Sequence, residues 1–261
     1  MSGRTRVELD ISGGLAVITL THPPVNALDR QLVGELVGAV DEVRRSEVAR
    51  AAVLTGGPKV FAAGGDVKEM LDWDYRRAVR DAHALGDACA ALAALPMPVI
   101  AAINGFALGG GLELALAADL RVCATDAKLG FPEVLLGVIP GAGGTQRLPR
   151  VVGASRAKEL IFSGRIIGAD RAREIGLVDH VTGPEAVLDR ARELAEPFLR
   201  GPALALRAAK TAVDRGLETS VENGLELERA LFAGLFATED RSVGMASFVT
   251  DGIGKAEFHG R

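Results

Sequence analysis

Along the first two thirds of the chain, the pattern of hydrophobic and polar positions changes between that of short strands and that of amphipathic helices. The runs RVELDIS and LAVITLT lie on either side of Gly13 and Gly14, a pattern that predicts a β-hairpin. From Asp29, the expected N-cap, apolar residues at helical spacing predict an amphipathic helix. The residues of this apolar stripe are Leu32, Leu36, Val40 and Val43.

Strands and helices are then expected to alternate. The runs AAVLTG, PVIAAING, LRVCAT and KLGF predict strands, and VFAAGGDVKEM predicts a glycine turn leading into a helix. Asp66 and Glu69 have the spacing of a capping box at that helix start. A further helix is expected over residues 75–94. After residue 150 strand patterns become scarce, so the order predicts an α/β fold with a helical C-terminal appendage that could pack on a neighbouring subunit.

Length and composition fit this picture. The chain has 261 residues, enough for one large domain or one domain with a smaller appendage. Hydrophobic residues make up 48% and aromatic residues only 4%, so the core must be built mostly from Ala, Val, Leu and Ile. The net charge of -4 gives no electrostatic reason to expect nucleic acid or an anionic membrane as a partner.

The two cysteines and the N-terminus indicate a reducing, cytoplasmic setting. Cys89 and Cys123 fit no metal-ligand spacing and are expected to be small buried hydrophobes. The stretch MSGRTRVELDIS lacks the apolar region of a signal peptide. The chain from Cys89 to Leu112 carries no charge and exceeds the ~20 residues that cross a bilayer. Its prolines and glycines favour buried strand and turn instead.

Two glycine turns form the first candidate site. Gly64-Gly65 and Gly109-Gly110-Gly111 each follow a predicted strand and precede a predicted helix. The first N–H groups of a helix lack intrahelical partners, and glycine allows a ligand to approach the backbone. Two such turns side by side could direct two N–H groups at one oxygen, as an oxyanion hole does. The alternative is two tight turns that serve only close packing.

Two carboxylates lie in apolar surroundings near these turns. Glu113 belongs to a helix that is apolar all round, which indicates burial and a raised pKa. The alternative is a glutamate stabilised by the helix dipole or by an arginine. Glu133 follows 20 residues later in GFPEVLL, before the glycine-rich loop IPGAGG. An oxyanion hole with two carboxylates suggests proton chemistry beside a carbonyl.

The motifs PVNALD, VFAAGGDVKEM, AAINGFALGGGLELALAADLRVCA, LGFPEVLLGVIPGAGGTQRLPRVVG, SGRIIGADRAREIGLVD and LFATEDRSVGMASFV occur in this order over nearly the whole chain. With them the chain resembles the enoyl-CoA hydratase/isomerase (crotonase) superfamily, and enoyl-CoA hydratases in particular. The resemblance implies a spiral of ββα turns over residues 1–195 and a helical trimerisation region over residues 196–261. It also implies a homo-oligomer, a trimer or a hexamer built as a dimer of trimers.

The resemblance assigns roles to the candidate residues. The N–H groups of Gly65 and Gly110 would hold the thioester oxygen of an acyl-CoA. Glu113 would activate water for attack at Cβ, and Glu133 would deliver a proton to Cα, giving reversible syn hydration of a trans-2-enoyl-CoA, as in β-oxidation of fatty acids. An isomerase or specialised lyase of the same superfamily, or a non-catalytic CoA-binding scaffold, are the alternatives. The presence of both glutamates argues against an isomerase, and that of both glutamates and both glycines argues against a scaffold. A dehydratase for an unusual acyl group stays an alternative, because the fold does not fix the substrate.

The resemblance also implies where coenzyme A binds, as part of the substrate and with no separate cofactor or metal. The residues expected to contact substrate or CoA are Ala63, Asp66, Val67, Lys68, Lys59, Gly141 and Lys255. Gly141 would line the water position. Lys59 and Lys68 would face CoA phosphates, the alternative being solvated surface residues, and Lys255 is the candidate for CoA contact in the C-terminal segment. Many hydratases have alanine where this chain has Gly65, a change that a backbone donor tolerates.

Overall fold

Two sheets form the centre of the computed structural model, which describes residues 5–261. The larger sheet has the order β1-β2-β3-β4-β6-β9, with β1 Val7–Ser12, β2 Leu15–Leu20, β3 Ala51–Thr55, β4 Val99–Ile103, β6 Leu120–Ala124 and β9 His180–Thr182. The smaller sheet has the order β5-β7-β8, with β5 Phe106–Leu108, β7 Lys128–Gly130 and β8 Ile166–Gly168. The pairs β1–β2 and β7–β8 are antiparallel, and the other neighbours are parallel.

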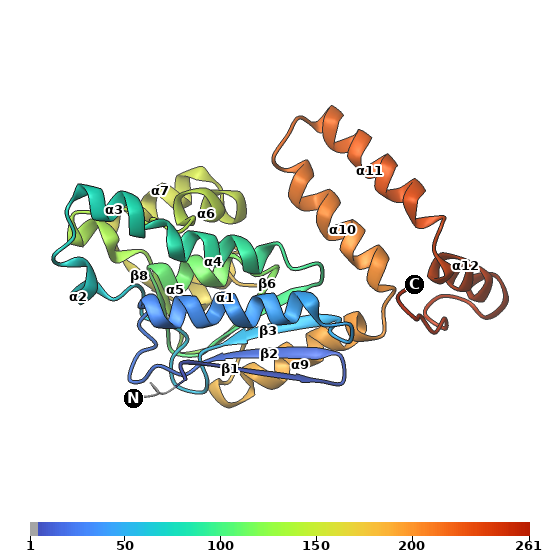
Figure 1. The fold of residues 1–261 in the computed structure, drawn as a ribbon, viewed down its shortest axis with the longest axis horizontal. Helices are drawn as coiled ribbons and strands as arrows, with labels where there is room; N and C mark the ends of the chain where they lie inside the picture. Colours follow the sequence, from blue (N-terminus) through green and yellow to red (C-terminus); the bar gives the residue numbers. More distant parts are fainter. Residues whose placement is uncertain (1–4) are drawn as a thin grey trace.

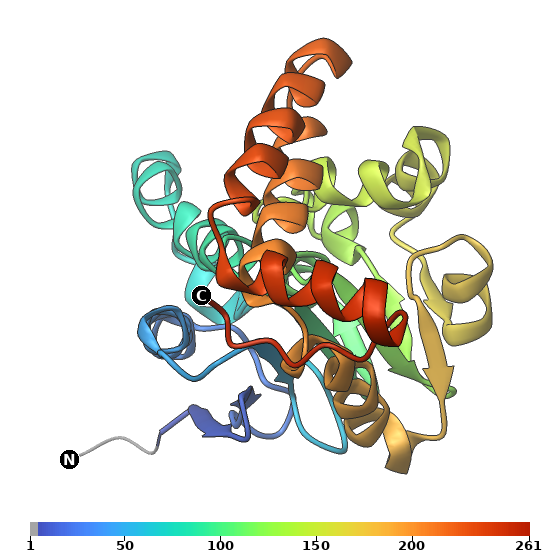
Figure 2. The same ribbon diagram turned by 90° about the vertical axis from the view of Figure 1, so that its right-hand side faces the viewer.

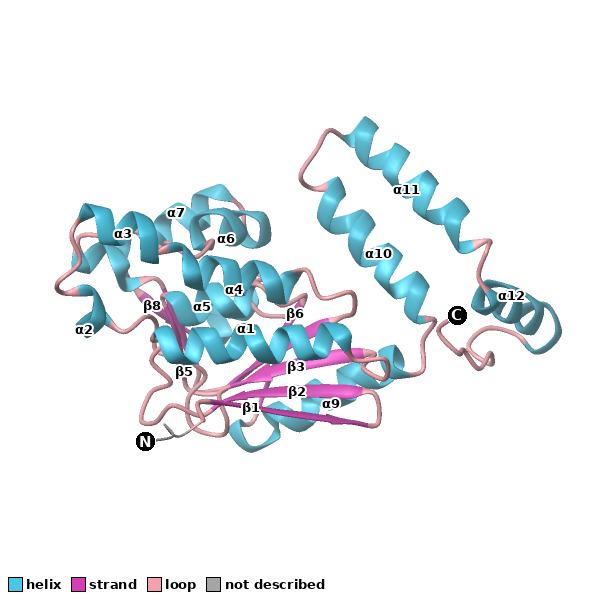
Figure 3. Ribbon diagram, viewed as in Figure 1, coloured by secondary structure: helices cyan, strands magenta, loops and turns pink. Residues whose placement is uncertain are grey.

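Helices surround these sheets (Figure 1; Figure 3). In the first two thirds of the chain they are α1 Arg30–Arg45, α2 Val67–Met70, α3 Tyr75–Asp81, α4 His83–Ala93, α5 Gly110–Leu116, the 3-10 helix η1 Pro132–Leu136, α6 Gly144–Val152 and α7 Ala154–Ser163. The last third contains α8 Ala169–Glu174, the 3-10 helix η2 Pro184–Ala186, α9 Val187–Leu199, α10 Ala203–Gly216, α11 Val221–Leu235 and α12 Glu239–Asp251.

From β4 to β7, consecutive strands alternate between the two sheets, which winds the chain into a spiral. Strand β4 lies in the larger sheet and β5 in the smaller one, and β6 and β7 repeat this step. A helical segment follows each pair, α5 after β5 and η1 after β7. The Gly109 N–H donates to the Gly130 carbonyl at 2.9 Å, so the ends of β5 and β7 are joined. The predicted ββα spiral is therefore confirmed, and it brings α5 and η1 to one region.

The local predictions near the N-terminus are confirmed. Gly13 and Gly14 connect β1 to β2 in the expected hairpin, both with positive φ. Helix α1 begins after Asp29, whose carboxylate accepts from the Leu32 N–H at 2.9 Å. The predicted apolar stripe of α1 is buried. It packs against β1, β2 and α4, because the stripe is the face that excludes water from the larger sheet.

The prediction of one helix over residues 75–94 is wrong in detail, because the helix is divided into α3 and α4 at Ala82. Asp81, at the end of α3, bonds to Arg30 of α1 at 2.9 Å, so a tertiary contact lies at the break. The predicted capping box is also incomplete. Asp66 accepts from the Lys68 N–H, but the Glu69 carboxylate accepts from the Arg30 N–H instead of returning to Asp66.

The cysteines and the charge-free segment behave as predicted. Cys89 and Cys123 are buried and free. The segment from Cys89 to Leu112 contains the end of α4, the strands β4 and β5, and the start of α5. Within residues 5–261, no helix is both long and apolar enough to cross a bilayer. The first four residues of the stretch considered for a signal peptide lie outside the described residues.

The last three helices extend away from the sheets. Helix α9 packs against β3, β4 and β6, whereas α10 and α11 form an antiparallel pair that projects from the body (Figure 2). Helices α10 and α11 contain no buried residue, and in α12 only Asp240 is buried. The Asp240 carboxylate accepts from the N–H groups of His259 and Gly260, which holds the C-terminal segment against the start of α12.

Candidate active site

The two glycine turns lie against each other. Gly64 has φ +102° and Gly109 has φ +51°, conformations that a side chain would strain. A Cβ atom on Gly64 would lie 3.8 Å from the Gly110 nitrogen, and one on Gly110 would lie 3.5 Å from the Gly65 nitrogen. The two turns therefore lie side by side, as an oxyanion hole requires.

Neither amide group is used in a hydrogen bond within the described part of the chain. The Gly110 N–H is the first of α5 and has no acceptor within its helix. Within residues 5–261, neither Gly65 nor Gly110 donates its N–H to a loop carbonyl or a side chain. Two close, unused donors can hold one negatively charged oxygen.

Glu113 lies one turn into α5 and is buried, with 2% of its surface exposed. Its Oε1 accepts from the N–H groups of Ala142 and Gly144, both at 2.7 Å. Burial raises the pKa of Glu113, while these backbone bonds and the charge of Arg147 oppose that rise. The expected burial and raised pKa are confirmed. The partners are backbone amides of the glycine-rich loop, which stabilise the ionised form.

Glu133 approaches the same region from η1, at the second position of this short helix. It is half-buried, and its Oε2 has no hydrogen-bond partner among the described residues. Burial, together with the negative charge of Glu113, raises the pKa of Glu133 to about 7. A Cβ atom on Gly109 would lie only 2.8 Å from Glu133 Oε1, so this carboxyl lies directly against the three-glycine turn.

The apolar surroundings expected for Glu133 are only partly present. Phe131 is buried and Val134 is half-buried, but Leu135 and Leu136 are 71% and 58% exposed. A short 3-10 helix turns its residues to different sides, so neighbours in sequence do not share one environment. The raised pKa of Glu133 therefore depends on its own burial and on Glu113.

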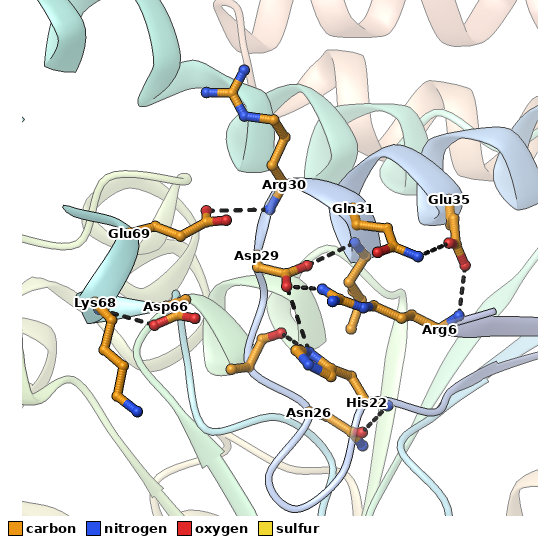
Figure 4. A network of polar contacts seen from close by, with 12 residues as sticks. Arg6, His22, Asn26, Asp29, Arg30, Gln31, Glu35, Asp66, Lys68 and Glu69 are labelled. Carbon is orange, nitrogen blue, oxygen red and sulfur yellow. Dashed lines mark hydrogen bonds and ion pairs between the residues drawn. The ribbon is translucent and has the colours of Figure 1, made fainter. Parts of the chain in front are cut away.

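The residues expected to contact CoA divide into two groups. Ala63, Asp66, Val67 and Lys68 follow the Gly64-Gly65 turn directly or flank it, and Asp66 serves as the N-cap of α2. Lys68 projects away from the Asp66 carboxylate that its N–H contacts (Figure 4).

Three further CoA or substrate candidates lie elsewhere. Lys59 is exposed on the loop after β3, and Gly141 lies in the loop that contacts Glu113. Lys255 is different, because the segment after α12 lies at the opposite end of the molecule from α2 (Figure 1). Within one chain, the structure does not bring Lys255 to the glycine turns.

A loop to which the sequence motifs assigned no role holds the first glycine turn in place. Asn26 is buried with φ +51°, and its amide donates to the carbonyls of Gly56, Val60 and Phe61 at 2.9–3.1 Å. The Leu28 N–H donates to the Gly64 carbonyl at 2.8 Å. The motif PVNALD was the available signal, because asparagine tolerates positive φ and carries two donors.

This loop continues into a polar network at the start of α1 (Figure 4). The Asp29 carboxylate caps α1, contacts Arg6, and lies 3.9 Å from His22 Nδ1. Glu35 accepts from the backbone N–H groups of Arg6 and Val7. Strand β1, the loop and α1 are thus tied together beside the segment that leads to Gly65.

Fold and site together define a class of protein, with two adjacent glycine turns and two carboxyls on a ββα spiral. The chain belongs to the enoyl-CoA hydratase/isomerase family, whose profile matches residues 10–260. YngF of Bacillus subtilis, named as an enoyl-CoA hydratase/isomerase, is 45% identical over 236 residues, covering 90% of this chain and 91% of YngF. The mitochondrial enoyl-CoA hydratase domain-containing protein 2 of Bos taurus is 42% identical over 241 residues, covering 90% and 81%.

Solved structures agree with this family. An enoyl-CoA hydratase subunit from Geobacillus kaustophilus matches with a TM-score of 0.93 and 41% identity, covering 98% of this chain and 99% of that one. An enoyl-CoA hydratase from Bacillus anthracis matches with a TM-score of 0.93 and 36% identity, covering 98% and 100%. The fold is therefore the crotonase fold.

Proposed function

We propose that the protein is an enoyl-CoA hydratase that reversibly adds water to a trans-2-enoyl-CoA, giving a 3-hydroxyacyl-CoA. The observation that carries the proposal is the juxtaposition of two carboxyls in different hydrogen-bonding environments with two free amide donors. Glu113 accepts two backbone N–H bonds, which favour its ionised form. Glu133 has a buried oxygen without a partner and a pKa raised to about 7, which favours its protonated form.

The two carboxyls would take different steps in one reaction. Glu113 accepts a proton from water as the water oxygen forms a bond to Cβ of the substrate. The electrons of the double bond move toward the thioester, whose oxygen is held by the N–H groups of Gly65 and Gly110. Glu133 then gives its proton to Cα. Proton exchange with solvent restores both carboxyls, so the reaction needs no separate cofactor.

Coenzyme A would be held on the side of the Gly64-Gly65 turn. The backbone of Ala63 and the start of α2, including Val67, are the nearest segments for the pantetheine chain. Lys59 and Lys68 are exposed and carry the charge that phosphates require. Lys255 could contribute only from another chain. A cytoplasmic location remains a prediction from the cysteines and the N-terminal sequence, and a role in β-oxidation remains a prediction from the resemblance.

Purified protein should consume crotonyl-CoA, which is followed by loss of the conjugated enoyl-thioester absorbance. E113Q should bind the substrate but turn it over far more slowly, because the base is lost. Failure of the wild type to hydrate any short or medium enoyl-CoA that it binds would contradict the proposal. Conversion of a 3-enoyl-CoA without hydration would instead indicate an isomerase.

We also propose that residues 196–261 form the oligomerisation region of a trimer or hexamer. Large apolar side chains on α10, α11 and α12 are exposed in one chain, including Val213 at 61%, Phe232 at 61% and Val249 at 82%. Exposed apolar surface of this extent indicates a partner, and a second copy with the same surface can supply it. Sedimentation should give the mass of three or six chains, and a monomer at micromolar concentration would contradict this proposal.

A further inference from the structure

Arg147 contacts the loop of residues 142–144, which in turn contacts Glu113. It belongs to α6, and its guanidinium folds back so that Nη1 donates to the Ala142 carbonyl at 3.2 Å. Its own N–H donates to the Gly143 carbonyl at 2.8 Å. Gly143 has φ +114°, and a Cβ atom there would lie 2.2 Å from Arg147 Nη1. The loop is therefore shaped around this side chain.

Residue 142 connects Arg147 to Glu113. The Ala142 N–H donates to Glu113 Oε1, and the carbonyl of the same residue accepts from Arg147. The second donor to Oε1, the Gly144 N–H, lies just beyond the peptide that Arg147 holds. Both bonds end on Oε1. Moving the loop would therefore move the carboxylate.

Arg147 also brings a positive charge to Glu113. Charged and titratable groups act on this carboxylate from three elements: Arg147 on α6, Glu133 on η1 and the buried Cys89 on α4. Of the three, only Arg147 favours the ionised carboxylate, since burial and the negative charge of Glu133 oppose it. In residues 5–261 the guanidinium has no carboxylate in ion-pair contact, and its hydrogen bond goes to Ala142.

We propose that Arg147 is a positioning residue that holds the Ala142–Gly144 loop, and through it the Glu113 carboxylate, in the reactive arrangement. It touches neither water nor substrate in this role. The inference rests on the proposed function, because it assumes that Glu113 is the base of the hydration reaction. Arg147 would act in two ways, through its hydrogen bond to the loop and through its positive charge, and substitutions can separate these two effects.

The test compares R147Q, which removes the charge, with R147K, which retains it. Arg150 offers a matched control, because it is on the same helix, is exposed, and donates to a helix carbonyl, that of Gln146. In R147Q, kcat for crotonyl-CoA should fall by about 10- to 100-fold, since small displacements of reacting groups cost this much. The acidic limb of the pH profile of kcat/KM should move to higher pH.

R147K should bring the acidic limb back to its wild-type position and restore part of kcat, and R150Q should change neither. Wild-type kcat and an unmoved limb in R147Q would overturn the inference, as would a loss of kcat with an unmoved limb. If R147Q does not fold, R147K decides alone: a kcat no lower than that of R150K overturns the inference. A wild type without hydratase activity would overturn the proposed function instead.

Discussion

Replacing Glu133 by glutamine tests the assignment of the proton donor. The side chain keeps its size, but it can no longer give a proton to Cα. General acid–base groups contribute about 10²–10⁴-fold to rates, so kcat of E133Q for crotonyl-CoA should fall by about that factor. Acyl-CoA binding should persist, because Gly65 and Gly110 still hold the thioester oxygen. Turnover is followed by the enoyl-thioester absorbance, and binding by calorimetry with a 3-hydroxyacyl-CoA.

The pH dependence should identify the same group. The pKa of Glu133 is raised to about 7 by burial, and its protonated form is the one that donates. In the wild type, hydration should therefore slow as the pH rises through about 7. E133Q has no titrating group at this position, so its residual rate should lack this alkaline limb.

The raised pKa also predicts a change in folding stability. The folded-state pKa of about 7 exceeds the ordinary value of 4.5, so the folded state resists ionisation of Glu133. The free energy of unfolding is thus highest below the ordinary pKa of Glu133. It falls by up to about 3 kcal/mol in all as the pH rises through about 7. Glutamine does not ionise. The gain in free energy of unfolding of E133Q over wild type should grow by about 2 kcal/mol between about pH 5.5 and pH 8.5.

Denaturant unfolding at fixed protein concentration measures this difference, and the exposed Glu47 gives a matched control. E47Q should show wild-type kcat and a stability difference that does not change with pH. A near wild-type rate of E133Q would show that Glu133 is not the acid. A stability gain that stays constant with pH would show that burial does not raise its pKa.

Three further substitutions test the elements that support the site. G109A should lose most hydratase activity and about 1–3 kcal/mol of stability in thermal unfolding. The reason is that φ at this residue is +51° and the new Cβ would lie 2.8 Å from Glu133 Oε1. An active, equally stable variant would contradict this. N26D should lose about 1–3 kcal/mol of stability in denaturant unfolding, because a carboxylate cannot donate to the three carbonyls that the Asn26 amide contacts. Unchanged stability would refute this role of Asn26. K210M should lose about 1.5–3 kcal/mol of stability in the same assay, because Lys210 bonds to Asp119 at 2.8 Å and only 11% of its side chain is exposed. A loss near zero would show that this pair does not stabilise the fold.

Elements with strong local signals were predictable from the sequence. The hairpin at Gly13 and Gly14 and the helix after Asp29 follow from turn chemistry, capping and periodicity, all of which act within a few residues. Among the four strands of three residues, β5, β7, β8 and β9, only β7 was expected, because three residues give too few positions to show a period. Such strands exist because a neighbouring strand supplies their hydrogen bonds.

In the candidate site, too, some features were predictable from the sequence and others depended on the tertiary structure. The sequence alone indicated that Glu113 is buried, because every side of its helix is apolar, and that glycine turns precede two helices. The family motifs then paired Glu113 with Glu133. The tertiary structure decided what no local pattern contains: which amides hold Glu113, how Arg147 grips their loop, and how Asn26 supports the first turn. These contacts join residues 29 to 35 positions apart or lie across a loop whose shape depends on the rest of the fold. Periodicity reports which face of an element avoids water, whereas hydrogen bonds between distant segments depend on how the packed sheets place those segments in space.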